Sequence, residues 1–485
     1  MAATIKTRTY DDAVGLLNSL QTPYHILKQR HDAGIRIDKT ANEEMRRCLH
    51  HIGYSQQDLE NLNIVHVAGT KGKGSTCAYV DSILSQYRKS RGVPKNVGLF
   101  TSPHLVAVRE RIRIDSAPIS AEVFAKYFFD VWDKLEAASE HKPVYFRYLT
   151  LMSYHVFLQE GVDAAVYEVG VGGEYDSTNI VDRPAVTGIS TLGIDHTFSL
   201  GDTIESIAWH KAGIQKKDVP SFTVRQNSGA LEVVESRAAE RGVKSFTVLD
   251  LDSRLQGVRI RPDAEFQKSN ASLAIALADT VLQKMDPSHV LPVDSLPKEY
   301  IDGLEQVVWR GRCETKVEGD ITWYLDGAHT AESIMVAAKW FSQECSNKSG
   351  TRALIFNQQG DRKAIELLEG LHTAITNEGT VKFDHVIFCP AVLGGTSTKR
   401  DFDDKGRDST DVSELTLQKA FAEKWKALDS STSTTIQVLP TIEDAFRYVR
   451  KLKSGESGNE VSTLITGSVR LVGTALAALE DVEAL

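Results

Sequence analysis

The sequence predicts an α/β protein built from two domains of unequal size, each with a mostly parallel sheet. Apolar strand-like runs alternate with helix-like stretches over most of the chain, and this alternation restarts near residue 307. A chain of 485 residues also exceeds what one hydrophobic core usually supports. We therefore place a first domain at residues 1–306 and a smaller α/β domain at residues 307–485.

Individual runs justify this fold class in chain order. The expected strands of the first domain lie at 96–100, 163–171, 185–191 and 221–224, and those of the second at 321–327, 353–360, 385–390, 435–439 and 462–468. Residues 264–283 have apolar residues at helical spacing and predict an amphipathic helix late in the first domain.

Composition narrows the class of protein. With 41% hydrophobic and 25% charged residues, the chain has the profile of an ordinary globular protein. Its net charge of -9 argues against a general nucleic-acid binder. Local lysines and arginines can still bind a small anionic substrate.

Cysteine usage and hydropathy indicate an intracellular protein. The 5 cysteines are scattered without metal-ligand spacing, as expected of reduced packing residues. No apolar run has the length needed to span a bilayer, and the N-terminus lacks a signal-peptide core. We expect a cytoplasmic monomer; a mitochondrial form with a longer upstream start would not be visible in this sequence.

The segment Ile64–Thr76, IVHVAGTKGKGST, has the composition of a phosphate-binding loop. A hydrophobic strand leads into glycines that can take positive φ, and an apolar helical pattern follows. Lys73 adds a cation, and Ser75 or Thr76 can approach a magnesium ion. The usual P-loop has four residues between its first glycine and Gly-Lys, so the spacing here departs from that signature. The alternative is an ordinary βα turn. The residues assigned to the loop are Gly69, Thr70, Gly72, Lys73, Gly74, Ser75 and Thr76.

A second polar cluster lies in Phe100–Ile114. Ser102 and Pro103 are expected in a turn that leaves His104 exposed. The arginines that follow alternate with apolar residues, as on a strand, and are Arg109, Arg111 and Arg113. A solvated arginine face is the commoner outcome. The turn would, however, lie at the carboxyl edge of the sheet, where open α/β folds bind ligands.

Two further clusters follow apolar strands of the first domain. Glu168 ends one strand, and a buried carboxylate is costly unless a cation or donors meet it. His196 follows the next strand and Lys211 lies on the subsequent helix. His196 has two interpretations, a satisfied core histidine or a metal ligand.

The start of the second domain carries Arg312, Asp326 and His329. Asp326 and His329 lie where a strand enters a helix. Such a pair can hold an amine, a ribose or a phosphate, whereas the simpler interpretation is a helix with Asp326 in the preceding turn.

Taken together, these motifs resemble the folylpolyglutamate synthase family. The segments that carry the resemblance occur in order from residue 66 to 473: GTKGKGST, TSPHLVAVRERIRI, FRYLTLMSYHVFLQEGVDAAVYEVGVGGEYDSTNI, GIDHT, AWHKAGI, WRGRCE, YLDGAHT and ITGSVRLVG. The resemblance implies an N-terminal P-loop-containing ATPase domain of the Mur-ligase-like superfamily, followed by a smaller Rossmann-like α/β domain.

The resemblance also implies roles for particular residues. Lys73 and its loop match the phosphate-binding segment, and Lys211 matches a lysine that is carbamylated in many relatives. Ser102, Glu168 and His196 match magnesium positions, and Asn270, Arg312 and Asp326 match positions near the nucleotide. Asp326 and His329 match residues near the incoming glutamate. Either of the two could be the base that deprotonates its ammonium group. Ser102, Pro103 and His104 resemble a folate-pocket loop, with Arg109 and Arg111 as cations for the substrate.

The implied reaction is an ATP-dependent amide ligation. L-glutamate would be added through γ-carboxyl amide bonds to reduced folate (poly)glutamates, with ATP, Mg²⁺ and a monovalent cation such as K⁺ taking part. Two alternatives remain open: dihydrofolate synthase, which adds glutamate to dihydropteroate, and a non-catalytic nucleotide-binding protein on the same fold.

Overall fold

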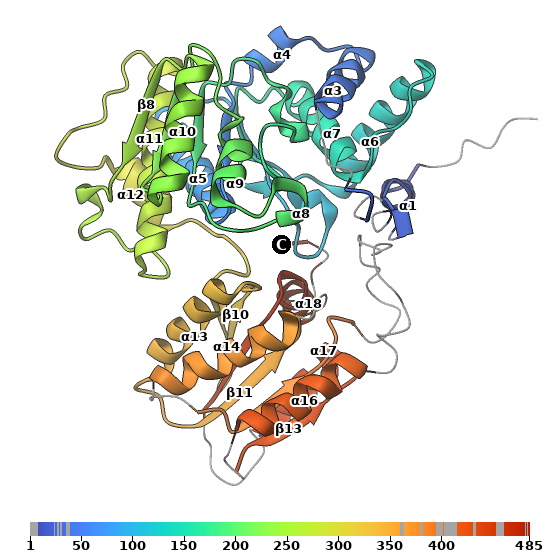
Figure 1. Cartoon of the computed structure of the whole chain (residues 1–485), viewed down its shortest axis with the longest axis vertical. Coiled ribbons are helices and arrows are strands. Elements are labelled where there is room, and N and C mark those ends of the chain that lie inside the picture. Colours follow the sequence, from blue (N-terminus) through green and yellow to red (C-terminus); the bar gives the residue numbers. More distant parts are fainter. Residues whose placement is uncertain are drawn as a thin grey trace, which may run out of the picture. The chain divides into compact units, whose positions relative to one another are not determined.

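The computed structural model describes most of the chain as two compact units (Figure 1). The first unit comprises Met1–His104, Val108–Val308 and Asp401–Gly406, and the second comprises Leu105–Ala107, Trp309–Arg400 and Arg407–Leu485. The described residues are 8–23, 25–26, 29, 32–34, 39–358, 363–378, 382–393, 401, 415–429, 433–452, 460–480, 482 and 484–485.

An 8-stranded sheet forms the centre of the first unit, in the order β4-β3-β2-β5-β1-β6-β7-β8. The strands from β2 to β8 in this order pair in parallel, whereas β3 and β4 are antiparallel. The carboxyl ends of the parallel strands therefore meet at one edge. The strands are β1 Val65–Ala68, β2 Val97–Phe100, β3 Ile112–Ile114, β4 Ala117–Pro118, β5 Ala164–Glu168, β6 Val186–Ile189, β7 Pro220–Val224 and β8 Ser245–Leu249.

Helices cover both faces of this sheet. α5 and α11 pack on one face, and α12 packs against α5. On the other face, α7 contributes to one apolar cluster, and α9 and α10 contribute to a second. The helices, with short 3₁₀ turns, are α1 Tyr10–Ser19, α3 Thr40–His51, α4 Gln56–Glu60, α5 Lys73–Arg91, η1 Val108–Arg111, α6 Ala121–Ala137, α7 Tyr145–Gln159, η2 Ser177–Ile180, α8 Thr197–Leu200, α9 Ile204–Ala212, α10 Ser228–Arg241, η3 Ser253–Leu255, α11 Glu265–Met285 and α12 Lys298–Glu305.

The second unit has a 6-stranded sheet in the order β13-β12-β11-β14-β10-β9, parallel except for β9. α13, α14 and α16 cover one face, and α17 and α18 cover the other. The elements are β9 Glu314–Glu318, β10 Ile321–Asp326, α13 Ala331–Cys345, β11 Thr351–Phe356, α14 Lys363–Glu378, β12 His385–Phe388, α16 Thr416–Leu428, β13 Thr435–Val438, α17 Ile442–Leu452, β14 Val461–Thr466 and α18 Val469–Glu480.

The predicted α/β class is confirmed, and every expected strand occurs at its place in the chain. One local prediction was wrong. Arg109 and Arg111 lie in the 3₁₀ turn η1 rather than on a strand, and only Arg113 lies on β3. Among the described residues, none of the helices combines the length and the apolar character needed to cross a membrane.

Candidate functional site

The loop between β1 and α5 has a backbone that only glycine fits. Gly69 has φ 149° and Gly72 has φ 83°. A Cβ on Gly72 would lie 2.1 Å from Oδ1 of Asn270, and one on Gly69 would lie 2.0 Å from Oγ of Ser190. The loop is therefore pressed between α11 and the end of β6.

Residues after β6 hold the loop in this shape. The backbone N–H groups of Thr70 and Lys71 donate to the carbonyl oxygen of Thr191 at 2.9 and 3.1 Å. The Ser190 hydroxyl donates to the Lys71 carbonyl oxygen at 2.7 Å. Sequence reasoning missed both Ser190 and Thr191. The signal was a pair of hydroxyl residues at the end of the strand predicted at 185–191, comparable to the hydroxyl pair that follows the strand predicted at 96–100.

Two lysines converge on one carbonyl group. Nζ of Lys73 donates to the Gly69 carbonyl oxygen at 3.0 Å, and Nζ of Lys211 donates to the same oxygen at 2.8 Å. Burial, together with the nearby charge of Lys73, lowers the pKa of Lys211 to about 7. One neutral acceptor cannot compensate the charge of Lys73 together with the partial charge of Lys211, so the loop favours an anion.

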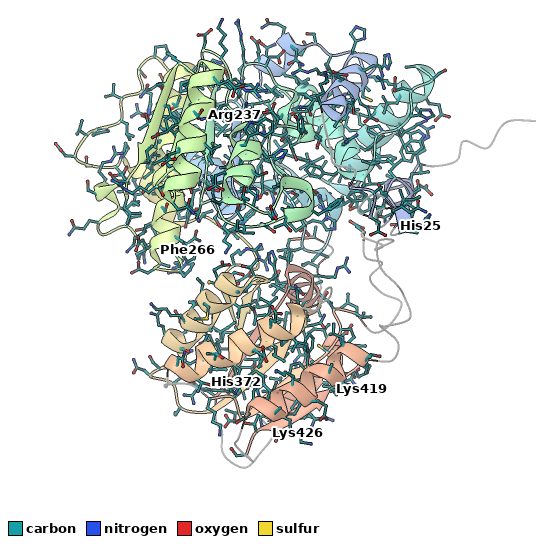
Figure 2. The ribbon with its side chains drawn as sticks, viewed as in Figure 1. His25, Arg237, Phe266, His372, Lys419 and Lys426 are labelled. Carbon is teal, nitrogen blue, oxygen red and sulfur yellow. The ribbon has the colours of Figure 1, made fainter. Side chains whose placement is uncertain are left out.

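Glu174 fixes the helix that carries Lys211. Its carboxylate accepts hydrogen bonds from Arg237, and its backbone N–H donates to the His210 carbonyl oxygen at 2.7 Å. The Arg237 guanidinium, which extends from α10 (Figure 2), also lies 4.5 Å from the ring centroid of Trp209. α9 is thereby held against α10, with Lys211 near its end.

The start of α5 provides the hydroxyl groups predicted for the loop. Gly74 and Ser75 lie within the first turn of α5, so positive φ in the loop is confined to Gly69 and Gly72. Thr76 is buried, and its Oγ1 has no hydrogen-bond partner among the described residues. An unpartnered buried hydroxyl at a helix N-terminus fits a bound phosphate or its metal ion.

Glu168 lies close to this loop. It ends β5, is 5% exposed, and accepts a hydrogen bond from the Ser102 backbone N–H at 2.9 Å. Burial and the Glu168 carboxylate raise the pKa of the Cys77 thiol, while the charge of Lys73 opposes them. Glu168 and Lys73 therefore both lie near Cys77. Magnesium at phosphate sites takes one or two carboxylates besides phosphate and water, so Glu168 and Ser102 fit such an ion.

His196, the third predicted metal ligand, lies in a left-handed backbone conformation, with φ 48°, at the start of α8. Its Nε2 is 3.6 Å from Oδ2 of Asp195, and the side chain is 45% exposed. The interpretation of His196 as a core histidine is therefore wrong. In the described part of the chain, no three His, Cys, Asp or Glu side chains gather as a metal-binding group, so the three-residue metal set remains a prediction.

The turn after β2 orders a buried arginine. Nε of Arg111 donates to Nδ1 of His104 at 2.9 Å, and its guanidinium lies 5.5 Å from the ring centroid of Tyr145. Burial lowers the pKa of Arg111. His104 is half-buried rather than exposed as expected, and Pro103 is exposed. Arg109 donates to the Ile119 carbonyl oxygen at 3.1 Å. Arg111 is thus not part of a solvated face.

In the second unit, Asp326 ends β10 and organises the backbone around it. Its two oxygens accept hydrogen bonds from the N–H groups of Cys313 at 2.8 Å and Ala328 at 2.9 Å. Burial raises the pKa of Asp326, and the charge of Arg312 opposes that rise. His329 is exposed, and its Nδ1 lies 2.9 Å from the Gly327 carbonyl oxygen.

Comparison with known proteins finds curated relatives that match nearly the whole chain. The chain is 55% identical to "Folylpolyglutamate synthase" of Neurospora crassa, over 99% of this chain and 93% of that protein. It is 42% identical to the protein of the same name from Candida albicans, over 98% of this chain and 96% of that protein. No family model matches.

A solved structure has the same fold. The Mycobacterium tuberculosis folylpolyglutamate synthase, complexed with ADP and AMPPCP, aligns with a TM-score of 0.68 at 23% identity. The alignment covers 94% of this chain and 98% of that chain. The two-sheet α/β fold of this chain is thus shared with a solved folylpolyglutamate synthase structure.

Proposed function

The chain belongs to the folylpolyglutamate synthase family, and from that premise we propose that it adds L-glutamate, through γ-carboxyl amide bonds, to tetrahydrofolate (poly)glutamates. ATP would phosphorylate the terminal γ-carboxyl group, the glutamate amine would displace phosphate from the acyl phosphate, and ADP and phosphate would be released. The observation that carries this proposal is 55% identity to a named relative over 99% of the chain.

The loop after β1 supports the ATP part of the proposal. The Gly69 carbonyl oxygen is shared by Lys73 and Lys211, at 3.0 and 2.8 Å, so positive charge is in excess beside the N-terminus of α5. That excess suits the transferring phosphoryl group, on which negative charge must be stabilised. Asn270 lies against the loop, and we assign it, with Arg312 and Asp326, to the nucleotide.

Lys211 has a second proposed role. With a pKa lowered to about 7, much of this amine is neutral near neutral pH. The neutral form is the one that can be carbamylated by carbon dioxide. We propose that Lys211 carries this modification during catalysis, as in many relatives, and that the added carboxylate partly neutralises Lys73.

For metal ions, we assign Ser102, Glu168 and His196 to Mg²⁺, with K⁺ as a further cation. When bound, magnesium would neutralise phosphate charge and polarise the transferring group. Glu168 is held by the Ser102 backbone N–H, and this contact fixes the carboxylate at the sheet edge.

For the folate, we assign the turn that contains Ser102, Pro103 and His104, together with Arg109 and Arg111. Because Arg111 is bonded to His104, the guanidinium positions this turn.

For the glutamate amine, His329 is the better candidate for the proton acceptor. Both oxygens of Asp326 already accept backbone N–H groups. A neutral His329 ring that donates from Nδ1 to the Gly327 carbonyl oxygen keeps Nε2 as an acceptor. We propose that His329 orients and deprotonates the ammonium group and that Asp326 supports its loop.

The test is incorporation of labelled L-glutamate with Mg²⁺ and ATP, followed together with ADP release. Tetrahydrofolate monoglutamate and dihydropteroate are supplied in parallel reactions, and sedimentation of the same sample tests the proposed monomer. Addition to the folate alone is the expected result. Addition to dihydropteroate would make the chain a dihydrofolate synthase, and absence of both products would favour a non-catalytic nucleotide-binding protein.

A further inference from the structure

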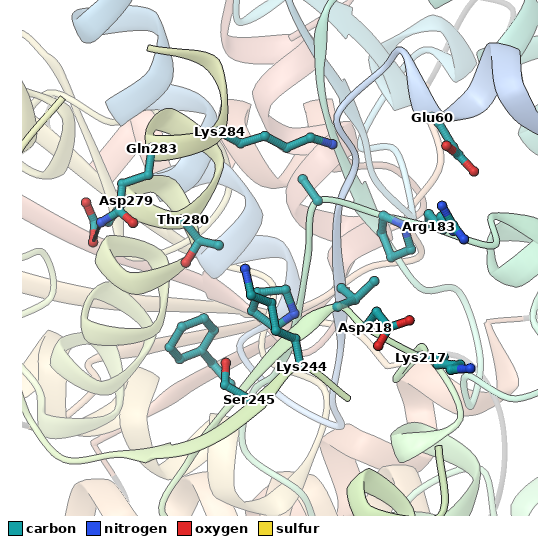
Figure 3. Close-up of a pocket in the computed structure, with 15 residues that line it drawn as sticks. Glu60, Arg183, Lys217, Asp218, Lys244, Ser245, Asp279, Thr280, Gln283 and Lys284 are labelled. Atoms are coloured by element: carbon teal, nitrogen blue, oxygen red, sulfur yellow. Dashed lines mark hydrogen bonds between the residues drawn. The ribbon is translucent and has the colours of Figure 1, made fainter. Parts of the chain in front are cut away.

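A hollow of about 820 Å³ opens at the amino-terminal edge of the larger sheet (Figure 3). Its wall includes Ala185, just before β6, and the first residues of β7 and β8, Pro220 and Ser245. The end of α11, including Lys284, and Glu60 at the end of α4 complete it. Its volume is typical of a small-molecule site.

This hollow is separate from the phosphate loop. The loop follows the carboxyl ends of β1 and β6, whereas the hollow lies at the amino ends of β6, β7 and β8. α11 spans the distance between them, since Asn270 touches the loop and Lys284 lines the hollow. At 1.5 Å of rise per residue, these positions are about 20 Å apart along the helix.

Cationic side chains outnumber carboxylates in the lining. Arg183, Lys217, Lys244 and Lys284 line the hollow, and Figure 3 shows the Lys244 and Lys284 ammonium groups directed into it. Within the described residues, Arg183, Lys217 and Lys244 form no ion pair with a carboxylate. Desolvation lowers the pKa of Lys284, and the Glu60 carboxylate opposes that shift.

The carboxylates of the lining do not fully cancel this charge. Glu60, Asp218 and Asp279 face four cationic side chains, which leaves an excess of one positive charge. Both oxygens of Asp279 already accept hydrogen bonds, from His289 at 2.9 Å and from Gln283 at 2.9 Å. Converging lysines without partners repel one another, and a bound anion removes that repulsion.

Part of the lining is apolar. It consists of Pro184, Ala185, Val219, Pro220 and Phe222. Apolar side chains beside converging cations suit a compact anion that has some hydrocarbon or ring surface.

We propose that this hollow is a second ligand site, which binds a small anion with two or more negative charges, carried by phosphate or carboxylate groups. Such an anion would bridge Lys244, from the start of β8, and Lys284, from the end of α11. The site lies outside the proposed ligase machinery and does not depend on the ligase reaction.

Calorimetric titration of the full-length chain tests this proposal, with tripolyphosphate and citrate as the probes. Because a phosphate probe would also enter the loop after β1, the titrations use the Lys73→Ala background. The test variant adds Lys244→Gln and Lys284→Gln. The matched control adds Lys89→Gln, an exposed lysine in the last turn of α5. Circular dichroism checks the fold of each variant.

We expect at least one probe to bind to the Lys73→Ala chain, with affinity that falls as ionic strength rises. The double substitution should weaken it by about tenfold or more, and Lys89→Gln should leave it unchanged. Binding of tripolyphosphate alone would identify a phosphate site, and binding of citrate alone a carboxylate site. The proposal is overturned if neither probe binds, if the double substitution has no effect, or if Lys89→Gln weakens binding equally.

Discussion

β1 and β10 are strands that each lead into a helix, but the charges at their carboxyl ends are balanced in different ways. β1 ends in a loop where one carbonyl oxygen, that of Gly69, accepts hydrogen bonds from two ammonium groups. β10 ends in Asp326, whose two oxygens accept two backbone N–H groups. The first strand end has cationic charge in excess, whereas the charge of the second is satisfied within the protein. The same kind of strand-to-helix connection thus suits an anion in one unit and supports its own backbone in the other.

The strongest test of the loop after β1 is the substitution Lys73→Ala. On the proposed function, this variant loses ATP-dependent glutamate addition by about a thousandfold, because its ammonium no longer neutralises the transferring phosphoryl group. Its fold should be kept, because Lys73 is only half-buried. The readout is labelled glutamate incorporation, with circular dichroism as control. Near-normal turnover would refute the assignment of this loop.

Lys211→Met tests the same loop through the pH dependence of the free energy of unfolding. The pKa of Lys211 is lowered from 10.5 to about 7 in the folded state. Below pH 7 the lysine is charged in both states, so the wild-type chain bears the full cost of burying it. Between pH 7 and 10.5 only the unfolded chain holds the proton, so wild-type stability rises with pH.

We therefore expect Lys211→Met to be the more stable protein at pH 6. The difference in free energy of unfolding between the variant and the wild-type chain should shrink by about 1.4 kcal/mol per pH unit above pH 7. Urea unfolding at several pH values, in buffer freed of carbon dioxide, measures this slope. A pH-independent difference would mean that Lys211 titrates normally. Activity should also be lost, since the variant cannot be carbamylated.

Gly72→Ala tests the shape of the loop. A Cβ at this position combines a left-handed backbone with a 2.1 Å approach to Asn270 Oδ1. Gly92, at the other end of α5, has φ 73° but nothing within 4 Å of its Cβ position. Gly92→Ala should cost about 1 kcal/mol of unfolding free energy from backbone strain alone. Gly72→Ala should cost about 2–3 kcal/mol, and equal losses would show that Asn270 moves aside freely.

Much of this organisation could be predicted from the sequence, because strands and helices follow from local periodicity. The strand that ends at Glu168 and the loop with Lys73 both occur where expected. Ser190 was missed because its role depends on β1 and β6 being neighbours, and spacing within a segment carries no information about strand order. η1 was missed because arginines that alternate with apolar residues fit a strand as well as a short 3₁₀ turn. The hollow is assembled from separate segments, so no single motif predicts it.

His329→Gln tests the end of β10 and should have the smallest effect on stability. α13 begins with a capping box between Thr330 and Ser333, and the Asp326 carboxylate accepts backbone N–H groups. The imidazole ring is therefore needed neither to cap α13 nor to hold the turn after β10. Because His329 is exposed, its replacement should change the unfolding free energy by less than about 0.5 kcal/mol. On the proposed function, kcat for glutamate addition should fall by about a hundredfold and the KM for L-glutamate should rise, because the ring both deprotonates and orients the incoming amine. The affinity for ATP should stay unchanged. Steady-state kinetics with each substrate varied in turn, beside urea unfolding, separates these effects. A loss of ATP affinity would place His329 at the nucleotide, and a large loss of stability would mean that the ring, as well as the Asp326 carboxylate, supports the turn after β10.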